Sequence, residues 1–329
     1  MFRLFHQNPM DGEKMVSMGR ELRTLVLPEG VDGERVDTAL TRVLGFSRTT
    51  VARLLEEGEI RSSGRTMVKS ERVTAGQVLE ILLPDTSVGA PIPLTPIEGL
   101  SVLYDDESIV VINKPVGCAA HPSPGWTGPT VVGALTAAGY SVSTRGAAER
   151  AGIVHRLDVG TSGLMVVAKT DQAYSFLKAA FKNRQVEKIY NALVQGHMDP
   201  STGTIDAPID RHPKEDYRFA VVAGGKTSIT HYEVMEFFRA VSLLKVELET
   251  GRTHQIRVHF SALRHPLVGD LTYGADPTLA ARLEISRPWL HALELRFRHP
   301  VSNRPLDFSA PYPEDLKRAL ALLESPTRP

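Results

Sequence analysis

The spacing of apolar residues gives the first part of the chain a different pattern from the rest. Between residues 33 and 84, apolar side chains first recur every three or four positions, which predicts two helices, and then fall into short runs, which predicts strands. Ser47 is expected to cap the second helix and Gly58 to end it. Ser63-Gly64 and Ala75-Gly76 provide turns between the strands. This order predicts a small, separate α/β unit.

From residue 100 onward, alternation of apolar and polar residues dominates. Strands are expected at 102–104, 109–113, 164–169, 188–195, 227–237, 242–249 and 290–297. Helices are expected at 172–182, with Asp171 as the cap, at 253–263 and at 313–323. Because strands and helices do not alternate regularly, this pattern predicts an α+β domain with a mixed, largely antiparallel β-sheet.

Composition shifts along the chain predict four segments. Residues 1–32 are expected to form a flexible leader, in which Met10, Met15 and Met18 are alternative starts. Residues 33–84 form the small unit, and residues 85–99 form a linker rich in proline. Residues 100–325 form the large domain, which is long enough to bury a core of its own.

The overall composition narrows the class of protein. With 42% hydrophobic and 23% charged residues, it is typical of a soluble globular protein. The chain has no apolar run of membrane-spanning length and no signal-peptide core, so we expect a cytoplasmic protein without a membrane partner. The 38 basic and 38 acidic residues cancel, which argues against a protein that coats nucleic acid but allows a local basic groove. A monomer is expected, because no exposed apolar helix stands out.

Metal and disulfide chemistry find little support in the residue counts. Cys118 is the single cysteine, which excludes an internal disulfide and a zinc site built from several cysteines. The eleven histidines are not spaced as a metal motif, and the chain has no Gly-x-Gly-x-x-Gly fingerprint or Walker loop. We therefore expect neither a metal nor a cofactor.

The segment around Asp158 is the strongest candidate for chemistry. An apolar run ends at His155-Arg156, Asp158 follows, and a turn of small residues at 160–163 leads into a second apolar run. A carboxylate at the end of a buried strand, beside Gly and Ser, is accessible to a bulky substrate. Asp158 is therefore placed to serve as a nucleophile or a general base.

Two later segments carry further candidates. Alternation over residues 186–196 predicts a strand with Lys188 and Tyr190 on one face, although a strand tyrosine is most often core packing. Thr253 is expected to cap a helix in which His254 and Arg257 share one face. Taken alone, that arginine would be assigned to a surface salt bridge.

Together these segments resemble one known family. Three motifs occur in the order typical of the RluA-type RNA pseudouridine synthases. They are His-Arg-Leu-Asp followed by Thr-Ser-Gly at 155–163, Lys-x-Tyr at 188–190 and Gly-Arg-Thr-His-Gln-Ile-Arg at 251–257. Asn-Lys-Pro-x-Gly at 113–117 belongs to the same pattern. Residues 33–84 resemble the S4 RNA-binding domain that precedes the RluD- and RluC-like members. Val159-Gly160 departs from the Lys-Asp of many relatives.

The resemblance implies an isomerase that converts uridine in structured RNA to pseudouridine without a cofactor. Asp158 would attack either the ribose C1′ or the uracil ring, and both routes stay open. Arg257 would pair with Asp158 and oppose the rise in pKa that burial of an aspartate causes. Tyr190 would stack on the uracil and help to take the proton from C5. His155 would support the turn and take no part in the reaction.

The resemblance also implies RNA contacts. Ribosomal RNA of the large subunit is favoured as the partner, and transfer RNA is possible. Lys114 is either a phosphate contact or an ordinary turn lysine, and the arginines of the small unit either face phosphates or form a solvated surface. The residues expected to bind RNA are Arg156, Lys114, Arg252, His254, Arg48, Arg53, Arg61 and Arg65.

Two alternatives compete with this interpretation. A catalytically inactive RNA-binding or chaperone protein would have lost reactive residues, yet Asp158, Tyr190 and Arg257 are all present. A glycoside or nucleoside hydrolase typically needs two carboxylates, and only Asp158 has a convincing setting. Release of free uracil would identify a hydrolase, and unchanged RNA would identify the chaperone.

Overall fold

The computed structural model describes residues 22–27, 31–44, 48–82, 94–122, 128–145, 150–213 and 218–324, with side chains at all of these except 23, 41–44 and 48–50. It divides the chain into two units, Met1–Pro91 and Ile92–Pro329. Each unit is described by itself. Residues 1–21 of the expected leader, the expected cap Ser47 and residues 85–93 of the expected linker lie outside the described residues.

The first unit combines two helices with an antiparallel sheet. Its strand order is β1-β4-β2-β3. Apolar residues of both helices and of the sheet, among them Leu40, Leu54 and Ile81, form one buried core. The elements are β1 (Leu22–Val26), α1 (Val36–Leu44), α2 (Arg48–Glu56), β2 (Ile60–Ser62), β3 (Arg65–Thr66) and β4 (Val78–Leu82).

The prediction of a leader through residue 32 is wrong for Leu22–Val26. These residues pair with β4 along its whole length, from Leu22 opposite Leu82 to Val26 opposite Val78. Leu22 and Val26 remain 64% and 61% exposed, whereas Leu27, just after the strand, is buried. An edge strand with such outward apolar residues gives no clean alternation, so the sequence did not indicate it.

The second unit is built on one large sheet. The strand order is β5-β6-β7-β14-β8-β13-β12-β9, and β15 adds to β14. Among the described residues, the β7–β14 pair is parallel and the other pairs of this sheet are antiparallel. The α+β class and the mixed, largely antiparallel sheet are therefore confirmed. Its strands are β5 (Ser101–Asp105), β6 (Ile109–Lys114), β7 (Ser162–Ala168), β8 (Glu187–Gln195), β9 (Thr202–Asp206), β12 (Ile229–Phe237), β13 (Val241–Leu248), β14 (Leu290–Arg298) and β15 (Pro305–Ser309).

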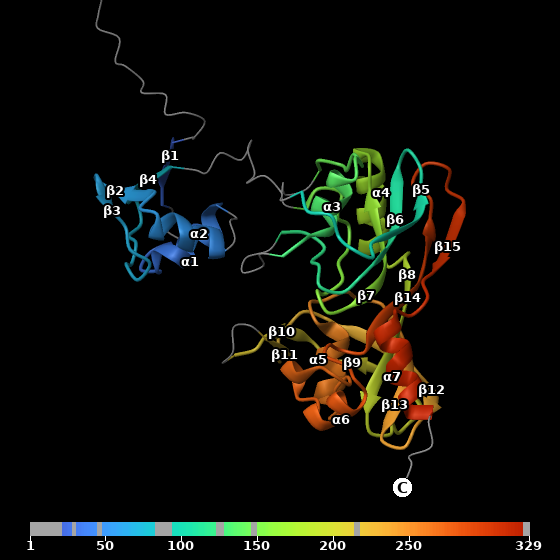
Figure 1. Ribbon diagram of the computed structural model, residues 1–329. Helices are drawn as coiled ribbons and strands as arrows, with labels where there is room; N and C mark the ends of the chain where they lie inside the picture. Colours follow the sequence, from blue (N-terminus) through green and yellow to red (C-terminus); the bar gives the residue numbers. More distant parts are fainter. Residues whose placement is uncertain are drawn as a thin grey trace, which may run out of the picture. The chain divides into compact units, whose positions relative to one another are not determined.

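Figure 1 shows helices beside both halves of this sheet, with β7, β14 and β8 between the halves. Strands β9 and β15, and the separate hairpin of β10 (Ile209–Arg211) and β11 (Phe219–Val221), were not predicted because they are short and largely exposed. No helix in the described ranges is long and apolar enough to cross a bilayer. The helical elements are α3 (Val131–Ala137), α4 (Asp171–Lys182), α5 (Gln255–Ala262), the 3₁₀ turn η3 (Leu271–Tyr273), α6 (Pro277–Arg282) and α7 (Glu314–Glu324).

The expected cap of α4 is corrected by one residue. Thr170 is the cap, and its side chain accepts a hydrogen bond from the Ala173 amide at 3.2 Å. Asp171 is instead the first helical residue, where its carboxylate accepts a hydrogen bond from Ser143 at 2.6 Å. A carboxylate in the first helical turn is also stabilised by the helix dipole, so both residues suit a helix start.

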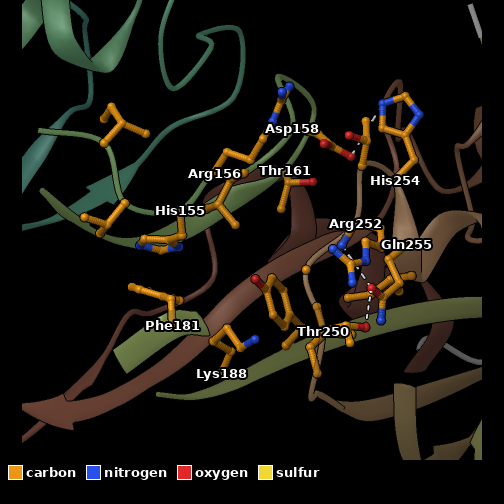
Figure 2. Close-up of a pocket in the computed structure, with 18 of the residues that line it drawn as sticks. His155, Arg156, Asp158, Thr161, Phe181, Lys188, Thr250, Arg252, His254 and Gln255 are labelled. Carbon is orange, nitrogen blue, oxygen red and sulfur yellow. Dashed lines mark hydrogen bonds and ion pairs between the residues drawn. The ribbon is translucent and has the colours of Figure 1, made fainter. Parts of the chain in front are cut away.

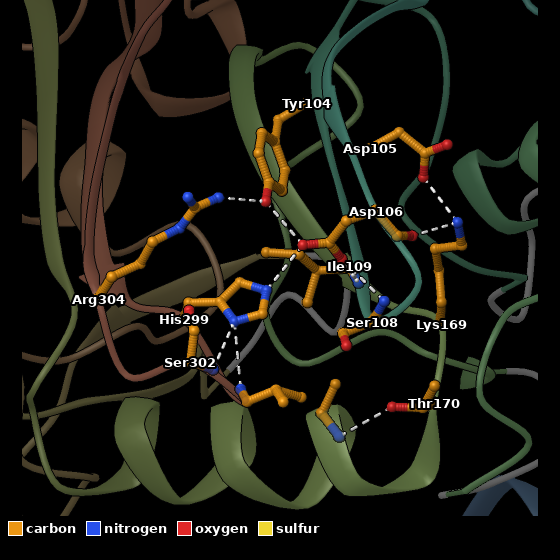
Figure 3. Close-up of polar contacts among 12 residues, drawn as sticks. Tyr104, Asp105, Asp106, Ser108, Ile109, Lys169, Thr170, His299, Ser302 and Arg304 are labelled. Carbon is orange, nitrogen blue, oxygen red and sulfur yellow. Dashed lines mark hydrogen bonds and ion pairs between the residues drawn. The ribbon is translucent and has the colours of Figure 1, made fainter.

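Polar contacts around Asp106 join the β5–β6 hairpin to the end of β14, as Figure 3 shows. One carboxylate oxygen accepts hydrogen bonds from the amides of Ser108 at 2.8 Å and Ile109 at 2.9 Å. The other contacts the Tyr104 hydroxyl and His299 Nε2, each at 2.7 Å. Burial acts to raise the pKa of Asp106, but these hydrogen bonds lower it to about 2. We call this group the Asp106 clasp.

Candidate active site

The loop that carries Asp158 is fixed from several sides before it enters β7. The Thr161 amide bonds to the Asp158 carbonyl at 3.0 Å, and the Gly117 amide bonds to the Val159 carbonyl at 3.0 Å. Gly163, at φ 117°, lies so close to β14 that a Cβ there would be 2.2 Å from the carbonyl oxygen of Ala292. The small residues after Asp158 therefore allow a close approach between this loop and the centre of the sheet.

The Asp158 carboxylate has few partners for a side chain that is only 16% exposed. Its Oδ2 lies 3.4 Å from Arg257 Nη1 and 3.8 Å from His254 Nε2. Figure 2 shows Asp158 and His254 facing each other across the top of a pocket. Both contacts are long for charged hydrogen bonds, so the carboxylate keeps acceptor capacity for a substrate.

Arg257 is held chiefly by a carboxylate that sequence reasoning missed. Its Nε and Nη2 donate to Asp270 at 2.7 and 2.9 Å, while the ring centroid of Tyr273 lies 4.8 Å from the guanidinium. Burial acts to lower the pKa of Arg257, but the hydrogen bonds and charge of Asp270 raise it. Arg257 is thus a fixed cation that reaches Asp158 with its remaining nitrogen. The available signal was Gly269-Asp270-Leu271-Thr272-Tyr273, which continues the family pattern after Arg257.

His254 occupies the position where a helix cap was expected from Thr253, and that prediction is wrong. His254 has left-handed backbone angles, φ 56° and ψ 21°, and makes no side-chain cap. The Gln255 side chain accepts from the Arg252 amide at 3.0 Å instead. Burial lowers the pKa of His254, and its Nδ1 lies 2.8 Å from the Tyr273 hydroxyl. That hydroxyl already accepts from the Phe219 amide, so its proton points to Nδ1 and the Nε2–H of a neutral ring faces Asp158.

Tyr190 lies on β8 and lines the same cavity as Asp158 and Arg257. It is 7% exposed, and burial, followed by the charge of Asp158, raises the pKa of its hydroxyl. The hydroxyl is therefore protonated at neutral pH. Lys188 also lines the cavity, and burial lowers its pKa to about 8. The predicted common face of Lys188 and Tyr190 is in keeping with this lining.

His155 has the supporting role that the sequence suggested. Its Nε2 accepts a hydrogen bond from the Val166 amide at 3.0 Å, and its ring stacks on Phe181 with centroids 4.6 Å apart. Burial lowers the pKa of His155 to about 3, so the ring is neutral. Because the imidazole nitrogen is occupied by the backbone of β7, His155 ties the Asp158 loop to the sheet.

The cavity has a volume of about 530 Å³ and is rich in cations. Its acidic lining residues are Asp158 and Glu249, and Glu249 is paired with Arg184 and with His231. Five basic side chains that line the cavity have no ion-pair partner among the described residues, and we call them the cationic wall. They are Arg156, Lys178, Lys182, Lys188 and Arg252.

Comparison with known proteins gives the same result over most of the chain. Residues 108–262 match the family model described as RNA pseudouridylate synthase. A protein of Mycobacterium bovis named "Uncharacterized RNA pseudouridine synthase" is 56% identical, over 92% of this chain and 98% of its own length. The "Ribosomal large subunit pseudouridine synthase D" of Xanthomonas campestris is 39% identical, over 95% and 96%. The chain belongs to the RluA-type RNA pseudouridine synthase family.

A solved structure extends the likeness to the fold. "Human RNA Pseudouridylate Synthase Domain Containing 1" is 29% identical and superposes with a TM-score of 0.55, covering 70% of this chain and 98% of that one. The sequence-based prediction of an RNA pseudouridine synthase, which is an isomerase, is therefore confirmed. The matched family segment begins after the first unit, so its S4-like character stays a prediction.

The residues predicted to bind RNA in this pseudouridine synthase separate into three groups. Arg156, Arg252 and His254 line the cavity. Arg53, Arg61 and Arg65 are exposed on the first unit, where Arg65 is paired with Glu71 at 2.7 Å, and the Arg48 side chain lies outside the described residues. The prediction for Lys114 is wrong. Its side chain is 0% exposed, so it cannot contact an RNA phosphate.

Proposed function

We propose that this pseudouridine synthase modifies large-subunit ribosomal RNA and that Asp158 is its nucleophile. The juxtaposition of Asp158, Arg257 and Tyr190 around one cavity carries the proposal. Relatives at 39 and 40% identity bear the name of a ribosomal large subunit pseudouridine synthase. The enzyme acts as a monomer in the cytoplasm and needs no cofactor, because the reaction is neither a net oxidation nor a hydrolysis.

The carboxylate begins the reaction. Asp158 attacks the ribose C1′ or the uracil ring, the C1′–N1 bond breaks, and the detached uracil turns within the cavity until C5 joins C1′. The bond to Asp158 breaks again, which releases the carboxylate. The proton on C5 then leaves and N1 gains one, so the atoms balance. Arg257 supplies the positive charge beside Asp158, and Asp270 prevents the guanidinium from swinging away.

Tyr190 forms the surface on which the base turns. Its aromatic ring stacks on uracil in either orientation, because stacking does not depend on which edge of the base faces the carboxylate. Since its raised pKa keeps the hydroxyl protonated, Tyr190 does not act as a phenolate base. The neutral hydroxyl instead passes the C5 proton onward, directly or through water.

The cationic wall holds the RNA backbone around the displaced nucleotide. Removing a uridine from its stack costs a few kcal/mol, least in a loop, and phosphate contacts offset that cost. Arg156 is exposed in the Asp158 loop, where it fills the gap left by the base or grips the displaced strand. The S4-like unit adds contacts to flanking RNA through Arg53, Arg61 and Arg65.

Modification mapping of RNA from a strain without this gene tests the proposal. We expect at least one pseudouridine of large-subunit ribosomal RNA to be missing and to return with the wild-type gene but not with Asp158→Asn. A site missing from transfer RNA alone would overturn the ribosomal assignment. Restoration by Asp158→Asn would overturn the role of Asp158, and free uracil released by the purified protein would indicate a hydrolase.

A further inference from the structure

Lys114 is a buried cation that the reaction described above does not use. It ends β6, and its ammonium donates to the carbonyls of Pro115 at 2.9 Å and Cys118 at 3.1 Å, with the Cys118 sulfur at 4.0 Å. These partners are uncharged. Burying an ammonium is costly unless an opposite charge compensates it. Its neighbours therefore satisfy its hydrogen bonds but leave its charge unexplained.

The turn that Lys114 organises also supports the Asp158 loop. The ammonium joins the two ends of the turn from Pro115 to Cys118. Within that turn Gly117, at φ 80°, donates its amide to the Val159 carbonyl at 3.0 Å. Val159 directly follows Asp158 in sequence. A displacement of the ammonium would therefore pass to the nucleophile through one turn and one hydrogen bond.

A second buried cation supports the loop at the next residue. Arg287 donates to the Gly160 carbonyl at 3.3 Å and to the Leu290 carbonyl at 3.2 Å. It is also held by Asp315, through hydrogen bonds of 2.7 and 3.0 Å. Arg287 thus has a carboxylate of its own, whereas Lys114 has no ion pair among the described residues.

Within the part of the chain that the structure describes, the ion pairs around the loop leave Lys114 as a buried cation without a carboxylate of its own. Arg257 is paired with Asp270 and Arg287 with Asp315. Lys114 has no such partner in the described ranges, although the charge of Asp158 acts on it without contact between the two groups. The other titratable groups on which the charge of Asp158 acts are Tyr190, Tyr273 and His254, and Arg156 in turn acts on His254.

We propose that Lys114 is a positioning residue that holds the Asp158 loop and supplies a second positive charge, beyond that of Arg257, near the nucleophile. The inference rests on the proposed role of Asp158. Lys114 touches no substrate, because it is fully buried. It acts on the rate of the reaction through Asp158 and leaves the affinity for RNA unchanged.

Two substitutions separate the charge of Lys114 from its hydrogen bonds. Lys114→Gln keeps a donor for the Pro115 and Cys118 carbonyls but removes the charge, and Lys114→Met removes both. Single-turnover rates are measured on one RNA substrate from pH 5 to pH 9, together with the Kd for that RNA. We expect a loss of about tenfold for Lys114→Gln and about a hundredfold for Lys114→Met at pH 7, with Kd within about twofold of wild type.

The shape of the pH profile distinguishes this role from a merely structural one. Without the nearby cation the protonated carboxyl is favoured, so the acidic limb should move to higher pH by up to about one unit in both variants. Burial lowers the pKa of Lys114 to about 8, so the wild type loses the same charge above pH 8. The ratio of wild-type to Lys114→Gln rates should therefore shrink from pH 7 to pH 9. Lys188 titrates in the same range but is present in both proteins and cancels in the ratio.

The controls separate the failure of this inference from that of the proposed function. Asp158→Asn measured in the same assay should be inactive, and an active Asp158→Asn protein would refute the proposed function itself. With Asp158→Asn inactive, wild-type rates and an unmoved acidic limb in Lys114→Gln would refute the role of Lys114. Should Lys114→Met fail to fold, as seen in its circular dichroism, Lys114→Gln decides the question, because it retains the donors of the turn.

Discussion

Asp106 and Asp158 lie in the same domain, and their surroundings show how an aspartate is suited either to stabilising the fold or to reacting with a substrate. In the Asp106 clasp, both carboxylate oxygens are occupied by donors between 2.7 and 2.9 Å away (Figure 3). Asp158 has contacts of only 3.4 and 3.8 Å and lines the cavity (Figure 2). A carboxylate whose acceptors are filled stabilises the fold, and one with free lone pairs and a fixed cation nearby remains available for a substrate.

The largest effect that this comparison predicts is the loss of activity in Asp158→Asn. An amide of the same shape cannot attack uridine, so the rate should fall by more than about 10³-fold. The folded protein loses two long contacts and one negative charge near Lys114 and Arg257, so its free energy of unfolding should fall by about 1 kcal/mol, less than in Asp270→Asn. Single-turnover assays and denaturant unfolding measure the two quantities. A large loss of stability would show that Asp158 resembles Asp106 more than the contacts indicate.

Asp270→Asn should have the next largest effect, because it removes the charge that fixes Arg257. Without its two charged hydrogen bonds to Asp270, the guanidinium can move onto Asp158 and occupy the free lone pairs that the reaction needs. We expect about a hundredfold loss of rate, and a loss of about 3 kcal/mol in the free energy of unfolding, since a buried cation is left unbalanced. The rate is measured at a temperature where circular dichroism shows the variant to be folded. Wild-type activity there would mean that Arg257 is positioned without Asp270.

The sequence predicted those site residues that stand in contiguous motifs. It did not predict the roles of residues that only the fold brings to the site. Asp158, Tyr190 and Arg257 stand in three separate motifs, and the structure brings all three to one cavity. Lys114 stands in a fourth motif, but a lysine beside Pro and Gly looks like a solvated turn residue. Its burial follows from the packing of the Pro115–Cys118 turn beneath the Asp158 loop, which no local pattern encodes.

The secondary structure shows the same division between elements that a local pattern indicates and elements that depend on tertiary contacts. Long strands such as β8 and β13 are buried on both faces or alternate regularly, and the sequence indicated them. β1 and β15 are edge strands with exposed side chains, whose existence depends on the neighbour with which they pair. At His254 a left-handed backbone takes the place of the expected Thr253 cap, and the imidazole contacts Tyr273 and Asp158. Local propensity yields to tertiary contacts at such positions.

Asp106→Asn is the structural counterpart of Asp158→Asn. It should lower the free energy of unfolding and leave the reaction rate intact, and the effect should be smaller. The amide cannot accept from all four donors, so the free energy of unfolding should fall by about 1–3 kcal/mol while the rate of uridine conversion at pH 7 stays unchanged. The folded pKa of Asp106 is lowered from 3.8 to about 2, so its contribution is present above pH 4 and is lost between about pH 4 and pH 2. The free energies of unfolding of wild type and variant should therefore converge as the pH falls through that interval. Parallel curves of this free energy against pH would contradict the prediction.

The smallest effect concerns cations rather than carboxylates. Arg257 and Arg287, next to the Asp158 loop, are balanced by carboxylates. Lys178 and Lys182 of the cationic wall are instead exposed and unpaired among the described residues. Replacing both by alanine should weaken RNA binding about three- to tenfold at low salt and reduce the slope of log Kd against log salt by about 0.7 per lysine. The single-turnover rate at saturating RNA should not change.

Lys317→Ala with Arg318→Ala is the matched control, because it removes two exposed charges from α7, outside the cavity lining. Its salt slope should equal that of the wild type. Equal slopes for all three proteins would mean that the unpaired cations of the wall do not meet phosphate. A reduced slope in the control would mean that RNA is attracted by the charge of the whole surface, without selection for the cavity that contains Asp158.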